Sequence, residues 1–155
     1  MTDNHFLAAV DLYHLGVVVP DLSEAAARYT AVSGYRWTKT VEQSLTVTTH
    51  TGDYEALLKI AFSLQAPYLE LIEESPGTLW TATPNAAAHH LGYWVDDLAA
   101  AAAHLEQHGY RQEARLAGDT LSLFAYYLDP TGARVEIVDR TLFPDFPNLV
   151  KSMAA

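Results

Sequence analysis

The chain contains no cysteine, and this absence excludes three kinds of site. Without a thiol there is no disulfide framework, no thiolate metal ligand and no cysteine nucleophile. Basic residues are also scarce, with 9 lysines and arginines against 19 acidic residues and a net charge of -10. Because this charge repels phosphate backbones and anionic lipid surfaces, neither nucleic acid nor a membrane is expected as a partner. The expected partner is a small molecule.

Long hydrophobic runs are absent as well. No apolar run approaches the roughly 18 residues that a membrane-spanning helix needs. The first residues, MTDNHFLAAVDLYH, contain acids and no basic segment of the kind that begins a secretion signal. These features predict a cytoplasmic protein. Half of the 155 residues are nevertheless apolar, which is enough for one domain with a hydrophobic core.

A motif near the N-terminus returns in the second half of the chain. The decapeptide YHLGVVVPDL begins at Tyr13, and HHLGYWVDDL begins at His89. Each copy is followed by an apolar-acid-apolar tetrad, LELI at 69–72 and VEIV at 135–138. The repeat predicts one domain over residues 1–155 that consists of two modules, 10–74 and 86–140, and a C-terminal tail, 141–155.

Both modules have the same expected order of elements, β-α-β-β-β. Apolar β-branched runs predict the strands, and acidic or hydroxyl residues before a helical pattern predict each helix start. Gly34 ends the first helix because glycine readily adopts a left-handed conformation. The proline-punctuated tail favours a surface strap or a lid over a further regular element. The expected helices are 23–32 and 99–107, and the expected strands are 12–19, 37–48, 55–63 and 68–73, then the HHLGYWV run, 112–116, 121–128 and 134–139.

Strand geometry assigns one histidine to each module. Side chains alternate across a strand, so His14 shares a face with Gly16 and Val18. Aligning the two Leu-Gly pairs matches His14 with His90. His89 is therefore expected on the other face or at the strand entrance.

The tetrads assign one glutamate to each module in the same way, Glu70 to the first and Glu136 to the second. If the first and last strands of a module lie side by side, each module presents a His–Glu pair on one sheet face. Two modules packed by their pseudo-symmetry would then bring two imidazoles and two carboxylates together. One cation would offset the cost of burying all four polar groups.

These motifs resemble the vicinal oxygen chelate superfamily, which includes glyoxalase I, methylmalonyl-CoA epimerase, extradiol dioxygenases and the bleomycin-resistance proteins. The resemblance covers residues 10–140 and rests on HLGVVVPDL, YLELIE, HHLGYWVDDL and DPTGARVEIVD. It implies an α+β fold of two tandem βαβββ modules whose sheets curl around a central metal-binding cavity. It also implies that the metal ligands are His14, Glu70, His90 and Glu136.

A mixed nitrogen and oxygen ligand set without thiolate suits Ni, Co, Mn, Zn, Fe or Mg, and the sequence does not choose among them. Such a site polarises a carbonyl and stabilises an enolate or enediolate. The resemblance therefore implies a metal-dependent isomerase, epimerase or lyase that acts on a small carbonyl compound. It places the general base at Glu136 or Glu70. The resemblance also allows a homodimer.

Glu55 is a third candidate acid/base residue, at a position where some epimerases keep a second glutamate. A solvated carboxylate beside Lys59 is the alternative interpretation. His50 is expected in a loop, and His5, His104 and His108 at the surface. Few arginines are available to hold an anionic substrate. Five aromatic residues are either core residues or the lining of an apolar pocket for a hydrophobic substrate, namely Trp37, Tyr93, Trp94, Phe124 and Tyr126.

Two other functions compete with this hypothesis. A protein of the bleomycin-resistance type would sequester a cationic ligand without catalysis, and the acidic charge suits that role. Such proteins generally lack the four ligand residues. An extradiol dioxygenase would bind Fe(II) through two histidines and one carboxylate, so Glu70 as a fourth ligand argues against it.

Overall fold

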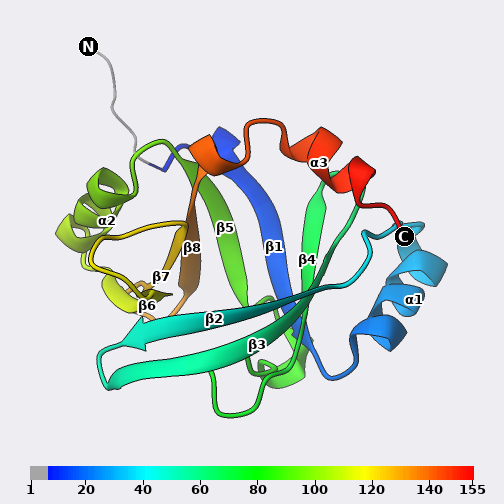
Figure 1. Cartoon of the computed structure of the whole chain (residues 1–155), viewed down its shortest axis with the longest axis horizontal. Helices are drawn as coiled ribbons and strands as arrows, with labels where there is room; N and C mark the ends of the chain where they lie inside the picture. Colours follow the sequence, from blue (N-terminus) through cyan, green and yellow to red (C-terminus); the bar gives the residue numbers. More distant parts are fainter. Residues whose placement is uncertain (1–6) are drawn as a thin grey trace. The chain divides into compact units, whose positions relative to one another are not determined.

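The computed structural model describes residues 7–155 (Figure 1). The chain has two compact units. Unit 1 comprises Thr46–Tyr54 and His90–Pro144, together with residues 7–13. Unit 2 comprises His14–Leu45, Glu55–His89 and Asp145–Ala155. His5, which we expected at the surface, lies outside the described residues.

Unit 2 holds most of the first module, except residues 10–13 and 46–54, which belong to unit 1. Its sheet has the strand order β1-β4-β3-β2, in which β1 pairs with β4 in parallel and β3 pairs with β4 in antiparallel orientation. Helix α1 packs against β4. The elements are β1 (Leu12–Val19), α1 (Leu22–Ser33), β2 (Val41–Thr49), β3 (Gly52–Phe62) and β4 (Tyr68–Glu73).

Unit 1 repeats this arrangement with the second module. Its strand order is β6-β7-β8-β5, with β5 and β8 parallel and α2 packed against β8 and β6. The end of β2, which belongs to this unit, pairs with β6. The elements are a 3-10 turn at Ala9–Asp11, β5 (His90–Val95), α2 (Leu98–Gln107), β6 (Arg111–Leu116), β7 (Phe124–Leu128) and β8 (Arg134–Asp139). A further 3-10 turn, Pro84–Ala86, precedes β5 in the sequence and belongs to unit 2.

The α+β class and the two βαβββ modules predicted from the sequence are confirmed. In each module the first and last strands are parallel neighbours, as the prediction of paired His–Glu positions required. None of the helices among residues 7–155 has the length and apolar character that crossing a membrane would need.

The two long helices begin and end as the sequence predicts. Asp21 accepts a hydrogen bond from the Glu24 amide at 2.9 Å, and Asp97 accepts one from the Ala100 amide at 3.0 Å. Each carboxylate satisfies an amide that has no partner within its helix. Gly34 then ends α1 with a φ of 73°, the left-handed conformation that glycine adopts without strain.

Each unit has its own hydrophobic core under its helix. In unit 2, Leu71 of β4 packs with Ala25 of α1 and with Trp37. In unit 1, Ile137 of β8 packs with Ala101 of α2, and both are fully buried. Leu71 and Ile137 occupy the same position in the two tetrads, directly after the glutamate. The repeat in the sequence therefore corresponds to a repeat in the packing.

Three strands start three or more residues from the predicted position. Strand β3 starts at Gly52 instead of residue 55, and β2 and β7 start later than predicted. Trp37 and Thr38 form isolated bridges to Ser63 and Ala154 instead of beginning β2, which starts at Val41. Strand β7 starts at Phe124 because Leu123 has a φ of 63° and interrupts the extended backbone. The apolar runs of β2 and β7 were correctly placed in the sequence, and the backbone conformation at their N-terminal ends makes both strands shorter than predicted.

The expectation of an irregular tail is wrong. Residues Arg140–Leu142 form a 3-10 turn, and Phe146–Ser152 form helix α3. Asp145 caps α3 by accepting from the Asn148 amide at 3.2 Å, and Pro147 stands in the first turn, where a missing amide hydrogen has no cost. The prolines that we interpreted as breaks therefore mark a helix start.

The turn before β8 gives a prediction on stability. The Asp129 carboxylate accepts from the Thr131 hydroxyl at 2.7 Å, the Thr131 amide at 2.8 Å and the Ala133 amide at 3.0 Å. These hydrogen bonds, the Thr131 hydroxyl first, lower the pKa of Asp129 below its usual 3.8. We expect Asp129→Ala to lower the melting temperature at pH 7.

The pH dependence follows from the direction of that shift. Because the folded state favours the ionised carboxylate, its contribution is complete above the ordinary pKa and is lost as the pH falls through the lowered one. The difference in melting temperature between wild type and Asp129→Ala should therefore shrink below about pH 4. A difference that stays the same from pH 7 to the acid range would contradict this account.

Candidate metal-binding residues

In unit 2, the parallel pairing of β1 and β4 brings His14 and Glu70 together. Gly16 is the register partner of Glu70, and His14 precedes Gly16 by two residues on the same strand face. Glycine has no side chain, so Gly16 places none of its own between these two residues. His14 Nε2 lies 3.6 Å from Glu70 Oε1, and both residues are buried.

In unit 1, β5 and β8 build the same pair. Gly92 is the register partner of Glu136, and His90 precedes Gly92 by two residues. His90 Nε2 lies 3.5 Å from Glu136 Oε1, and both residues are buried. The two pairs therefore agree in strand direction, in register, in the atoms that face each other and in burial.

A third strand adds an aromatic ring to each pair. Phe62 of β3 is the register partner of Glu70, and Tyr126 of β7 is the register partner of Glu136. The Phe62 ring stands edge-on to the His14 ring, with centroids 5.8 Å apart and planes at 82°. Tyr126 and His90 make the same contact at 5.1 Å and 82°. Each imidazole is thus bordered by a carboxylate and an aromatic ring.

Phe62 was not predicted from the sequence, although Tyr126 was named as a core residue or a residue lining an apolar pocket. Phe62 precedes its glutamate by eight residues and Tyr126 precedes its own by ten, because the two connecting turns differ in length. Aligning the motifs does not bring the two rings into register for this reason. Only the strand pairing reveals that they are equivalent.

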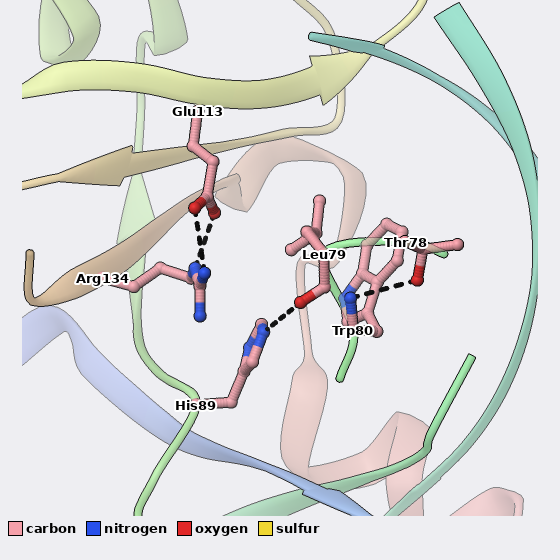
Figure 2. A network of polar contacts seen from close by, with 6 residues as sticks. All are labelled: Thr78, Leu79, Trp80, His89, Glu113 and Arg134. Carbon is pink, nitrogen blue, oxygen red and sulfur yellow. Dashed lines mark hydrogen bonds and ion pairs between the residues drawn. The ribbon is translucent and has the colours of Figure 1, made fainter. Parts of the chain in front are cut away.

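His89 has a different environment from His90, as strand alternation predicts. Its amide donates to the Gly16 carbonyl at 2.7 Å, and its Nε2 lies 2.8 Å from the Leu79 carbonyl oxygen (Figure 2). This contact fixes the segment after β4, where the Trp80 amide also donates to the Thr78 hydroxyl at 3.1 Å. His89 therefore has a structural role in unit 2.

The other candidates are spread over the units. Glu55 lies exposed on β3, an odd number of residues from Phe62 and hence on the opposite face of the strand. His50 lies in the turn between β2 and β3, His108 is exposed, and His104 is half-buried beside it. None of these residues belongs to either His–Glu pair.

Some of the aromatic candidates pack in the hydrophobic cores, and others lie beside a His–Glu pair or stack on another ring. Trp37 belongs to the core of unit 2, where its indole donates to the Ala26 carbonyl at 3.0 Å. In unit 1, Trp94 is buried and stacks on Tyr13 with centroids 3.6 Å apart. Phe124 stands edge-on to Tyr126 at 5.7 Å. Tyr93 packs against the core of unit 1.

Several of the few cations are held by acidic side chains. Arg134 makes a two-pronged contact with Glu113, at 2.6 Å from Nε and 2.9 Å from Nη2 (Figure 2). Lys59 lies 3.9 Å from Glu42 and 3.8 Å from Glu73, and not beside Glu55 as the alternative interpretation expected. Arg28 pairs with Glu24, and Arg140 pairs with Asp11 and Asp96. The described ion pairs thus neutralise four of the nine lysines and arginines.

Each pair offers a metal ion one imidazole nitrogen and one carboxylate oxygen. Histidine and carboxylate are common ligands of divalent metals, and both types of donor are present here without a sulfur ligand. Burial of a carboxylate beside an imidazole is costly in the absence of a compensating charge. The chemistry of these pairs therefore fits a divalent cation.

Known proteins resemble this chain in fold and, over most of its length, in sequence pattern. A search of curated proteins gave no match. Methylmalonyl-CoA epimerase of Streptomyces coelicolor, solved with 2-nitronate-propionyl-CoA, is similar in structure with a TM-score of 0.60 and 19% identity, over 83% of this chain and 96% of that one. The Mycobacterium tuberculosis methylmalonyl-CoA epimerase gives 0.58 and 18%, over 90% and 92%. A hypothetical protein of Bacillus halodurans gives 0.59 and 18%, over 83% and 92%.

At these identities the structural likeness concerns the fold. The family follows from a different comparison, in which residues 13–126 match the model of the glyoxalase, bleomycin resistance protein and dioxygenase superfamily. This match covers most of the chain and includes the first His–Glu pair and His90. It confirms the resemblance that the repeated motifs indicated. The chain belongs to the glyoxalase/bleomycin resistance protein/dioxygenase superfamily.

Proposed function

We propose that the chain is a metal-dependent isomerase, epimerase or lyase that moves a proton next to a carbonyl group. His14, Glu70, His90 and Glu136 are the proposed ligands of one divalent ion. The observation that carries this proposal is the duplicated pair, because the same two residue types meet in the same register in both units. Each pair also buries a carboxylate beside an imidazole, and a bound divalent ion would offset the cost of that burial.

The charges of the four residues fit this role. Two neutral imidazoles and two carboxylates carry a combined charge of about -2, which a divalent cation balances. A set of two nitrogen and two oxygen donors suits Ni, Co, Mn, Zn, Fe or Mg with water completing the coordination. When bound, such an ion would polarise a substrate carbonyl and stabilise the negative charge of an enolate.

The remaining chemistry falls to the side chains. We place the general base at Glu136 or Glu70, whose carboxylate would take the proton from the carbon beside the carbonyl. Return of that proton to a neighbouring carbon gives isomerisation. Epimerisation needs a proton delivered to the opposite face, and the other glutamate in its protonated form would supply it while the first keeps the proton it took. Glu55 stays the weaker candidate because it is exposed and lies on the opposite face of β3 from Phe62.

The proposed substrate is a small carbonyl compound with an apolar body. Each His–Glu pair is bordered by an aromatic ring, Phe62 in one unit and Tyr126 in the other. Coenzyme A carries several phosphate charges, whereas this chain has a net charge of -10 and holds four of its nine cations in ion pairs. The epimerase neighbours bind CoA compounds, and these features favour a different substrate here. A cytoplasmic location and a homodimer stay predictions.

One alternative function belongs to a different class. A protein of the bleomycin-resistance type would sequester a cationic small molecule without a metal, and the acidic balance of the chain favours it. The duplicated His–Glu pairs favour the enzyme, because sequestration needs no such ligand set. An extradiol dioxygenase is less favoured, since a fourth protein ligand would occupy a position that oxygen or a catechol needs.

Metal content tests the proposal first. We expect about one equivalent of a divalent metal in protein purified without an affinity tag, and none in the His14→Ala, Glu136→Gln double variant, as measured by inductively coupled plasma mass spectrometry. His104 of α2 and His108, which follows the end of that helix, have rings 4.5 Å apart and form a pair outside both His–Glu pairs that could bind metal nonspecifically. A His104→Ala, His108→Ala variant is therefore the matched control and should keep its metal. Absence of metal in the wild type after addition of each candidate ion would favour the sequestering protein.

Proton exchange in D2O tests the chemistry. The metal-loaded protein should exchange the hydrogen beside the carbonyl of apolar ketones or hydroxyketones, followed by NMR, faster than the metal-free protein. Methylmalonyl-CoA should be a poorer substrate than an apolar carbonyl compound. Efficient exchange of methylmalonyl-CoA alone would keep the enzyme class and overturn the proposed substrate class.

A further inference from the structure

The C-terminal helix α3 carries an aromatic ring that contacts the surroundings of the His14–Glu70 pair. One residue lies between this ring and His14. Phe146, the first residue of α3, is buried and stands edge-on to Phe62 with centroids 5.2 Å apart and planes at 81°. Phe62 in turn stands edge-on to the His14 ring at 5.8 Å. All three residues belong to unit 2. A continuous series of ring contacts thus runs from α3 to the histidine.

A second ring closes this cluster. Tyr68 of β4 is the register partner of His14, and it stands edge-on to Phe146 with centroids 5.1 Å apart. Tyr68 precedes Glu70 by two residues, so the two side chains leave the same face of β4. Phe146 therefore packs against one residue beside each member of the pair, Phe62 beside His14 and Tyr68 beside Glu70.

Helix α3 is fixed at both ends. Asp145 caps its start, and Asn148 Nδ2 donates to the Asp145 carboxylate at 2.6 Å. After the helix, the Lys39 amide donates to the Met153 carbonyl at 2.7 Å, and the Ala155 amide donates to the Trp37 carbonyl at 3.0 Å. Val150, one helical turn after Phe146, is also buried, with 1% exposure. Phe146 is therefore held in place by contacts on both sides of it.

In unit 1 a strand of the module itself supplies the corresponding rings. Tyr126 contacts His90, and Phe124, on the same strand, contacts Tyr126 at 5.7 Å. There the supporting ring comes from β7 itself. Unit 2 has no such residue on β3 at the corresponding place in sequence, since Ile60 stands two residues before Phe62. Helix α3 supplies the missing ring.

We propose that Phe146 is a positioning residue for His14, acting through Phe62, so that the C-terminal helix sets the metal affinity of one half of the centre. The inference rests on the proposed metal centre. A ligand histidine binds tightly when its neighbours hold its ring in one orientation, and loss of a hydrogen-bonding neighbour that does so typically costs about 10-fold to 100-fold in affinity. Edge-to-face aromatic pairs supply part of that restraint.

Phe146→Leu tests the proposal, because leucine keeps an apolar side chain in the helix and removes the ring. We expect this variant to bind Co²⁺ about 10-fold more weakly than the wild type, measured by titration in the visible absorption band. Val150→Ala is the matched control. It removes buried volume from the same helix without touching the ring series, so it should lower the melting temperature and leave the Co²⁺ affinity unchanged.

The metal-free protein gives an independent readout. NMR spectra of the imidazole nitrogens should change for His14 in Phe146→Leu and stay the same for His90. Equal affinities of wild type and Phe146→Leu, or equal losses in Phe146→Leu and Val150→Ala, would overturn the positioning role alone. A wild-type protein that binds no metal would instead overturn the proposed function, and this inference with it.

Discussion

Glu136→Gln is expected to remove metal binding and proton exchange while leaving the protein folded. The substitution keeps the size and shape of the side chain, so packing on β8 changes little. It replaces an anionic oxygen donor by a neutral amide, which is a poor ligand for a divalent ion. Since loss of a supporting contact alone costs about 10-fold to 100-fold in metal affinity, loss of a direct ligand should cost at least about 100-fold.

Two further variants distinguish loss of the metal from loss of the general base. Glu70→Gln should also lose the metal, because Glu70 occupies the same position in unit 2. If one of the two variants keeps metal and loses exchange, its glutamate is the general base. Glu55→Gln is the control, and it should keep both metal and exchange because Glu55 is exposed on β3.

Metal content by mass spectrometry and exchange in D2O by NMR measure both properties on the same samples. Thermal unfolding should be compared only in the metal-free state, because a bound ion raises the stability of the wild type. A Glu136→Gln protein with a full equivalent of metal and normal exchange would remove the main support for the proposed centre.

Ile137→Ala is expected to have the largest effect on stability. Ile137 is fully buried in the core of unit 1, between Ala101 of α2 and the register partner Ala125 of β7. Truncation to alanine loses buried apolar surface and leaves a cavity that small neighbours cannot fill. Substitutions of this kind cost about 2 to 5 kcal/mol. This is a large fraction of the stability of an ordinary domain.

Urea unfolding of the metal-free protein measures this free energy. Leu71→Ala should give a loss of similar size, because Leu71 holds the equivalent position in the core of unit 2 and is also fully buried. Leu142→Ala is the control, since its side chain is 54% exposed and its removal should change the free energy of unfolding by less than about 0.5 kcal/mol. A loss below about 1 kcal/mol for Ile137→Ala, less than core truncations cost, would show that unit 1 does not depend on this core.

Much of the fold was readable from the sequence because its signals are local and occur twice. The caps Asp21 and Asp97, the αL residue Gly34 and the apolar strand runs act within a few residues of chain, so composition and spacing reveal them. The repeat then doubles the evidence for each element. It also matches the two histidines and the two glutamates of the modules with each other, because strand alternation is a property of the backbone and holds wherever the strands are placed.

The strand partners were decided by the tertiary structure. The sequence marks Gly16 and Glu70 but does not state that they lie in register, because more than fifty residues separate them and pairing depends on how the whole sheet assembles. The same is true of Phe62 and Tyr126, whose unequal spacing from the glutamates hid their equivalence. The tail is the clearest case. Its prolines suggested irregular structure, and α3 forms because Phe146 and Val150 find a buried site on unit 2 that local sequence cannot reveal.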